Sequence, residues 1–156
     1  MKRLFFTGGA LIILDQILKN TFENTRALVT SNFGIKYAEN TGAAFGTLKD
    51  STPILTTVSI VAIIIILYYY LKLSQRKNFS KSLSLGMILL FAGTIGNLID
   101  RIFFGYVRDF ILIWKWPVFN LADTFSCIGV ALIIIYVVKT DYPKVIKKIK
   151  HIKRFI

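Results

Sequence analysis

The stretch GTIGNLIDRIFFGYVRDFILIWKWPVFNLAD, residues 93–123, decides the fold of this chain. It ends one apolar run, crosses a short mixed segment and begins another apolar run. It also carries three aspartates, Asp100, Asp109 and Asp123. A charged side chain at the centre of a membrane costs at least about 2.5 kcal/mol on insertion scales. Acidic residues in such an apolar setting are therefore candidates for a functional role.

The composition is that of a membrane protein. The chain has 156 residues, enough for one domain, of which 54% are hydrophobic, and its mean hydropathy is +0.60. Uncharged runs cover residues 51–71 and 82–99, and each is long enough to cross a bilayer. The net charge of +12 does not indicate nucleic-acid binding, because the interleaved aromatic pattern of such binders is missing.

Two more spans are expected where acidic residues interrupt apolar runs. The first resembles a secretory signal, but Asp15 breaks its apolar centre and no small-residue cleavage site follows, so we expect a retained helix. The sequence thus predicts an all-α membrane protein, a single integral membrane domain over residues 1–156 with a small extracytoplasmic β-like subdomain. The four transmembrane helices are expected at about 4–22, 53–71, 83–104 and 119–139, with outer loops at 23–52 and 105–118 and a basic cytoplasmic tail at 140–156.

The charges predict the orientation. With four spans, both termini lie on one side of the membrane, and that side holds thirteen of the 20 lysines and arginines but only one acid, Asp141. The positive-inside rule then makes both termini cytoplasmic. The tail has isoleucines at helical spacing between lysines, which fits a helix on the membrane surface as well as it fits a frayed, solvated end.

The remaining polar residues converge at one depth, under the outer face of the membrane. The helix directions place the following residues in this layer: Asp15, Lys19, Asn97, Asp100, Arg101, Asp109, Asn120 and Asp123. We expect Asp15 to pair with Lys19 four residues later, and Asp100 to pair with Arg101. Gly93 and Gly96 are expected to allow close helix packing, the two asparagines to link helices, and Cys127 to be a small buried residue.

Two aspartates, Asp109 and Asp123, have no basic neighbour on the same helical face. Arg108 precedes Asp109, but in an extended segment its side chain points to the opposite side. Two unpaired carboxyl groups in a low-dielectric cleft share a proton, because both cannot ionise cheaply. One ionised and one protonated carboxyl can activate a water and protonate a leaving amine. The pattern therefore suggests an aspartic-type peptidase.

Other chemistries fit less well. His151 lies in the tail, too far away to activate Cys127 or a serine at the outer face, and a metal site would have to rest on carboxylates alone. The alternative is a small proton- or ion-coupled membrane transporter, which also places acids within the membrane. A transporter needs polar groups along a complete pathway, whereas the cytoplasmic halves of these spans are almost entirely apolar.

Five motifs, in order, resemble the lipoprotein signal peptidases (signal peptidase II). They are residues 15–19 (DQILK), 40–45 (NTGAAF), 93–101 (GTIGNLIDR), 107–110 (VRDF) and 119–123 (FNLAD). The resemblance covers nearly the whole chain. One position departs from it, because the residue before the first catalytic aspartate is often apolar in the family and is Arg108 here.

The resemblance implies a multi-pass aspartic endopeptidase of the bacterial inner membrane, with its active site near the extracytoplasmic face. Such a hydrolase acts in lipoprotein maturation, removing the signal peptide before the diacylglyceryl-modified cysteine without a metal or cofactor. Its partners are lipid-modified prolipoprotein signal peptides and membrane lipids, not nucleic acid, and we expect a monomer. Asp109 and Asp123 match the catalytic pair. The supporting or substrate-binding residues match Asp15, Lys19, Asn40, Gly93, Asn97, Asp100, Arg101 and Asn120.

Overall fold

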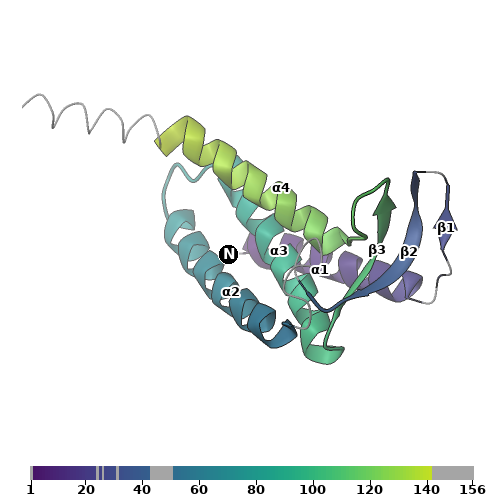
Figure 1. The fold of residues 1–156 in the computed structure, drawn as a ribbon. Coiled ribbons are helices and arrows are strands. Elements are labelled where there is room, and N and C mark those ends of the chain that lie inside the picture. The colour runs from purple at the N-terminus through teal and green to yellow at the C-terminus, as the bar shows by residue number, and fades with distance from the viewer. Residues whose placement is uncertain (1, 24, 26, 31, 43–50, 142–156) are drawn as a thin grey trace, which may run out of the picture.

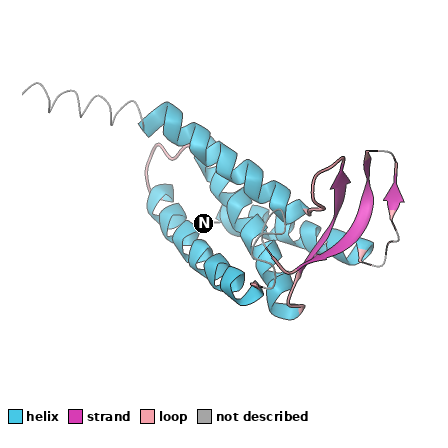
Figure 2. Ribbon diagram, viewed as in Figure 1, coloured by secondary structure: helices cyan, strands magenta, loops and turns pink. Residues whose placement is uncertain are grey.

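The computed structural model of the chain describes residues 2–23, 25, 27–30, 32–42 and 51–141. The described part is mostly helical, with one small sheet at the end of the helices (Figures 1 and 2). The helices are α1 (Lys2–Phe22), α2 (Thr52–Ser74), α3 (Lys81–Phe103) and α4 (Leu121–Tyr136), which continues as a π-helical turn, η2 (Val137–Asp141). The strands are β1 (Leu28–Val29), β2 (Phe33–Asn40) and β3 (Val107–Ile113). The expected basic tail falls mainly outside the described residues.

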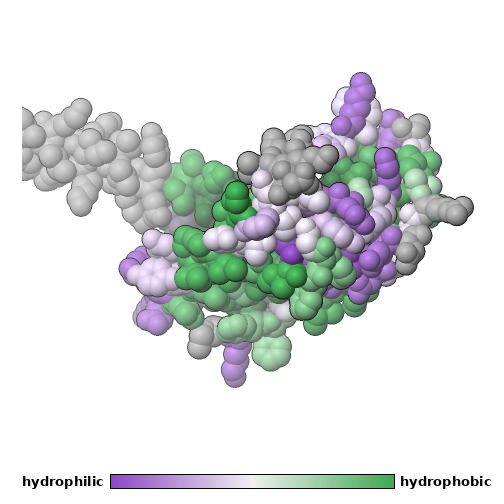
Figure 3. Space-filling view, turned by 60° about the horizontal axis from the view of Figure 1, so that its bottom comes forward, coloured by the Kyte–Doolittle hydropathy of each residue, from purple (hydrophilic) through white to green (hydrophobic). Residues whose placement is uncertain are grey.

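Three of these helices are long and apolar enough to cross a membrane: α2, α3 and the continuous segment Leu121–Thr140. The helix α1 is not among them, because Asp15, Gln16 and Lys19 lower the hydropathy of its second half. Hydrophobic residues form a band across the helical part, and hydrophilic residues gather at the sheet end and, in smaller number, at the opposite end (Figure 3). This distribution matches the membrane class that the composition predicts.

The helix α3 lies at the centre and packs against α1, α2 and α4. A Cβ at Gly93 would overlap Ser126 Oγ and the Ala122 carbonyl oxygen on α4. A Cβ at Gly96 would lie 2.7 Å from Asp15 Oδ2 on α1. These two glycines therefore allow the close approach that the sequence predicts, and they bring the polar residues of three helices within hydrogen-bonding distance of one another.

The apolar core lies away from the sheet, between α1, α2 and α3. Its buried members are Leu4, Ile66, Tyr70, Leu83, Met87, Ile88 and Phe91. Their burial fixes the helices at one end by apolar contact. The buried polar residues gather at the other end, towards the sheet.

The sheet has the order β1-β2-β3 and is antiparallel throughout. Strand β3 confirms the extended segment that the alternation of residues 106–111 predicts. Ala38 of β2 lies opposite Asp109 of β3, one register irregularity away from the pair Ile35 and Ile111. After β3 the chain turns at Trp114 (φ 48°) and comes back alongside the strand, where Ile111 N donates to Phe119 O at 2.8 Å. This return places Asn120, at the start of α4, next to Asp109.

Candidate active site

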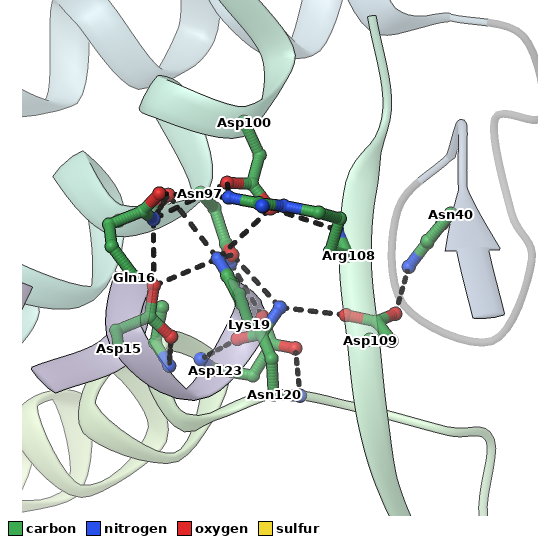
Figure 4. Close-up of polar contacts among 12 residues, drawn as sticks. Asp15, Gln16, Lys19, Asn40, Asn97, Asp100, Arg108, Asp109, Asn120 and Asp123 are labelled. Carbon is green, nitrogen blue, oxygen red and sulfur yellow. Dashed lines mark hydrogen bonds and ion pairs between the residues drawn. The ribbon is translucent and has the colours of Figure 1, made fainter. Parts of the chain in front are cut away.

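Two aspartates from different elements meet through one asparagine (Figure 4). Asn120 Nδ2 donates to Asp109 Oδ1 at 2.7 Å. Asn120 is also the N-cap of α4: its side-chain oxygen accepts from the backbone N of Asp123 at 2.8 Å, and its own backbone N donates to Asp123 Oδ2 at 3.2 Å. This reciprocal pair is a capping box, a local arrangement that fixes both side chains at the helix start. Fully buried Asn120 thus touches both carboxyl groups.

Two more asparagines complete the hydrogen bonds of the pair. Asn40, the last residue of β2, donates to Asp109 Oδ2 at 3.0 Å. Asn97 of α3 donates to Asp123 Oδ1 at 2.7 Å. All four carboxyl oxygens accept from neutral N–H groups, and within the described part of the chain neither aspartate forms a salt bridge. The pair is therefore oriented without a cation in direct contact that would hold either carboxyl ionised.

Asp109 has a strongly perturbed titration. The pKa of Asp109 is raised to about 7, mainly because the carboxyl is buried and secondly because of the nearby charge of Asp123. Hydrogen bonds from Asn40 and Asn120 and the charge of Lys19 oppose the shift. A buried carboxyl beside a second carboxyl, with its pKa near neutrality, is a typical arrangement for acid–base chemistry.

Lys19 acts on the pair through Asn97. Its Nζ donates to Asn97 Oδ1 at 3.1 Å, and the same oxygen accepts from Asn120 Nδ2 at 3.0 Å. With its oxygen occupied by two donors, the Asn97 amide must present its NH₂ group to Asp123. The orientation of this amide, which electron density often leaves ambiguous, is fixed here by its partners.

Asp15 ties the first helix to the last one. Its Oδ1 accepts from the backbone N of Ala122 at 2.9 Å, in the first turn of α4. Its Oδ2 pairs with Lys19 Nζ at 2.9 Å, which is the ion pair that the sequence predicts. Asp15 therefore stabilises the helix terminus that carries Asp123.

Asp100 does not pair with Arg101 as expected. Its Oδ1 lies 2.9 Å from Arg108 Nη2, and its Oδ2 lies 3.3 Å from Lys19 Nζ. Successive residues of a helix do not face each other. Asp100 therefore points to α1 and β3, whereas Arg101 points to a different side of α3. Arg101 lines the cleft that both Asp109 and Asp123 border.

A cluster of polar side chains around Arg108 was not predicted from the sequence. Gln16, Asn20 and Glu23 of the segment around α1 all accept hydrogen bonds from this arginine. The three residues are spaced by four and three positions, which places them on one stripe of a helix. That spacing is the signal that would have indicated a common partner.

A cleft of about 690 Å³ opens beside the aspartates. Its walls come from the end of β2, from α3, from β3 and the turn after it, and from the start of α4; they include Asn40, Gly42, Asn97, Arg101, Asp109, Trp116, Phe119, Asp123, Ser126, Cys127 and Ile128. Cys127 was expected to be buried, but it is exposed, because the face of α4 that it shares with the cleft is not covered by another helix. The cleft is thus polar where the aspartates lie and mainly apolar along the turn after β3, and Ile128 of α4 adds to the apolar surface.

The donor set does not suggest a bound metal ion. In the described ranges, no group of three or more His, Cys, Asp or Glu side chains is placed to hold one. Every buried side-chain nitrogen and oxygen of those ranges also has a hydrogen-bond partner.

The fold and the site define an integral membrane protein with a polar cleft at one end of its helices. The family model described as signal peptidase (SPase) II matches residues 8–139. A lipoprotein signal peptidase of Clostridium tetani is 36% identical over 141 residues, covering 83% of this chain and 88% of that protein. One of Halothermothrix orenii is 39% identical over 132 residues, covering 81% and 88% respectively.

Solved structures agree with the sequence matches. A bacterial membrane enzyme determined by the in meso method at 2.3 Å resolution superposes with a TM-score of 0.82 at 28% identity, covering 92% of each chain. A second, at 1.9 Å resolution, gives a TM-score of 0.77 and also 28% identity, covering 90% of this chain and 95% of that one. The chain belongs to the signal peptidase II family, and it is a membrane-bound protease.

Proposed function

We propose that this protein is an aspartic endopeptidase that removes the signal peptide from diacylglyceryl-modified prolipoproteins, cutting before the lipidated cysteine. One observation carries the mechanism: Asn120 holds the carboxyl groups of Asp109 and Asp123 on one cleft without a cation in direct contact. The substrate class follows from the family and from the names of the relatives.

The proposed reaction uses one shared proton. Asp123, ionised, takes a proton from a water whose oxygen attacks the scissile carbonyl carbon, while Asp109, protonated, gives its proton to the carbonyl oxygen. When the tetrahedral intermediate collapses, the C–N bond breaks, the leaving amine takes the proton from Asp123, and Asp109 recovers a proton from the hydroxyl group. Both carboxyls then return to their starting states, and no metal or cofactor takes part.

The other residues support these two. Asn40, Asn97 and Asn120 orient the carboxyls, Lys19 orients Asn97, and Asp15 and Asp100 hold Lys19. Gly93 allows α4 to approach α3 closely enough for the contact between Asn97 and Asp123. Arg101 lines the cleft, where its guanidinium would meet the backbone of a bound peptide.

The proposed membrane placement follows the charge distribution. We place α1 as a fourth span beside α2, α3 and α4, with both termini in the cytoplasm and the sheet at the outer face of the bacterial inner membrane. The exposed tryptophans Trp114 and Trp116 then lie at the interface, where such side chains are enriched. The apolar wall of the cleft, formed by the turn after β3 and by Ile128, would face lipid and admit a signal helix from the side.

Charge removal at either aspartate tests the mechanism. We expect Asp109→Asn and Asp123→Asn each to lower cleavage of a lipidated precursor by about 1000-fold, because a single proton-transfer group supplies up to about 10⁴ in rate. The measurement is the mobility shift of the precursor in proteoliposomes containing the purified variants. Asp141→Asn, at the far end of the last helix, is the matched control and should cleave normally. Near-normal cleavage by either of the first two variants would contradict the assignment.

The substrate class needs its own comparison. A precursor with its diacylglyceryl group should be cleaved much faster than the same precursor without it, because the acyl chains hold the cleavage site at the depth of the pair. Equal rates for the two precursors would refute a requirement for the lipid while leaving the aspartate mechanism intact.

A further inference from the structure

The side chain of Arg108 lies next to Asp109 in the chain but points away from it, and it is only 2% exposed. Its five N–H groups all find acceptors. Nε and Nη2 donate to the two oxygens of Asp100 at 3.3 and 2.9 Å, Nη2 also donates to Gln16 Oε1 at 3.0 Å, and Nη1 donates to Asn20 Oδ1 and to Glu23 Oε2. A guanidinium has five donors in a fixed plane, so this set of acceptors uses all of them.

The backbone N–H of Arg108 and the flat face of its guanidinium group make further contacts. The backbone N of Arg108 donates to Asp100 Oδ2 at 2.9 Å, and the guanidinium lies 4.2 Å from the centre of the Phe104 ring. Strand β3 is therefore fixed at this position to α1 and α3 on one side. On its other side, Asp109 is held by Asn40 and Asn120.

Arg108 also bears on the second aspartate. Asp100 Oδ2 is shared between Arg108 and Lys19, and Lys19 in turn orients Asn97 towards Asp123. Without the arginine, Asp100 would keep Lys19 as its only cation among the described residues, and the attraction would draw the ammonium from Asn97. Arg108 thus influences the position of Asp109 through strand β3, and the position of Asp123 through the polar contacts of Asp100, Lys19 and Asn97.

We propose that Arg108 is a positioning residue of the proteolytic site. It holds the carboxyl groups of Asp109 and Asp123 in their orientation without contacting the substrate. This inference rests on the function proposed above. Arg108 does not line the cleft, so its loss should change the alignment of the catalytic groups and leave the walls that bind the peptide unchanged. A misplacement of about 1 Å at reacting groups lowers the rate about 100-fold.

Two variants of different severity test the proposal in the full-length protein in proteoliposomes with lipidated precursor. Arg108→Met, which keeps an unbranched apolar stem but removes all five donors, should lower kcat about 100-fold with KM within about twofold of the original. Arg108→Lys keeps the charge but not the planar set of five donors, so it should recover part of this loss, to within about tenfold. Lys36→Met, which removes an exposed cation from β2, is the matched control and should leave both constants unchanged.

Hydrogen–deuterium exchange separates positioning from a general loss of fold. In Arg108→Met we expect faster exchange in β3, including the amide of Asp109, with exchange in α2 as in the original protein. An unchanged kcat, a change confined to KM, no recovery by lysine, or equally faster exchange in α2 and β3 would each overturn the proposal. If the original protein does not cleave lipidated precursor, the proposed function fails, and exchange at β3 still decides whether Arg108 positions Asp109.

Discussion

At the scale of single residues, the environment of Asp109 sets the pH range in which the pair can work. Asp109 lies buried in a paired strand, where it interacts with the charge of Asp123 on α4 and with the cations Lys19 of α1 and Arg101 of α3. Its raised pKa of about 7 means that it keeps a proton through the acidic range and loses it as the pH rises through neutrality.

The activity should therefore fall on the alkaline side. Above pH 7 Asp109 ionises and no acid remains for the carbonyl oxygen, so kcat should fall about tenfold for each further pH unit. The measurement is kcat between pH 5 and 9 at saturating lipidated precursor, with the intact fold checked by circular dichroism at each pH. A kcat that stays level up to pH 9 would show that the pair loses no essential proton in this range.

Some residue contacts could be predicted from the sequence and others could not. The pair Asp15–Lys19 follows from a spacing of four on one helix, and the outward direction of Arg108 from Asp109 follows from strand alternation. The partners of Asp100 and the contact of Asn120 with Asp109 depend on how separate elements meet. Contacts between different elements produce no pattern in the spacing of residues along the chain, so these contacts can be recognised only in the folded structure.

At the scale of the elements, close contact between α3 and α4 brings Asn97 to Asp123. The helix ranges expected from apolar runs lie close to those observed, such as 53–71 against Thr52–Ser74, because long apolar segments are a strong signal. The strand pairing is harder to predict from the sequence. The sequence predicts an extended segment at residues 106–111 but not the register that places Ala38 opposite Asp109.

Gly93→Ala should weaken the contact between α3 and α4. A Cβ there overlaps Ser126 Oγ and backbone of α4, and overpacking of this kind costs about 1–3 kcal/mol of the free energy of unfolding. Thermal unfolding in detergent should show a lower midpoint, and cleavage should fall with it because Asn97 moves from Asp123.

Gly9→Ala is the control within the same fold. Gly9 lies in α1, and a Cβ there meets nothing within 4 Å. The alanine should leave the unfolding midpoint unchanged or raise it, because alanine favours the helix by up to about 1 kcal/mol over glycine. Equal midpoints for the two variants would contradict the role of Gly93 in packing.

At the scale of the whole molecule, the charges predict a single orientation. Lys36 lies exposed on the sheet, and Arg76 lies exposed in the turn between α2 and α3. If four helices span the membrane as proposed, these residues lie on opposite sides. This orientation follows from the distribution of lysine and arginine between the two sides.

Thiol labelling in intact cells tests this orientation. In a Cys127→Ser background, Lys36→Cys should react with a membrane-impermeant maleimide from outside, whereas Arg76→Cys should react only after the inner membrane is opened. The reverse pattern would invert the topology, and labelling of both positions from outside would show that the number of spans between them is even.

The contact between Asp15 and the backbone of Ala122 has a consequence for biosynthesis. The first helix leaves the ribosome carrying a hydrogen-bond acceptor for a helix start that is translated more than one hundred residues later. Until then Asp15 and Lys19 have each other as partners, while Asp123 does not yet exist. Asp123 therefore joins the site only after α4 has been translated and has docked onto α1.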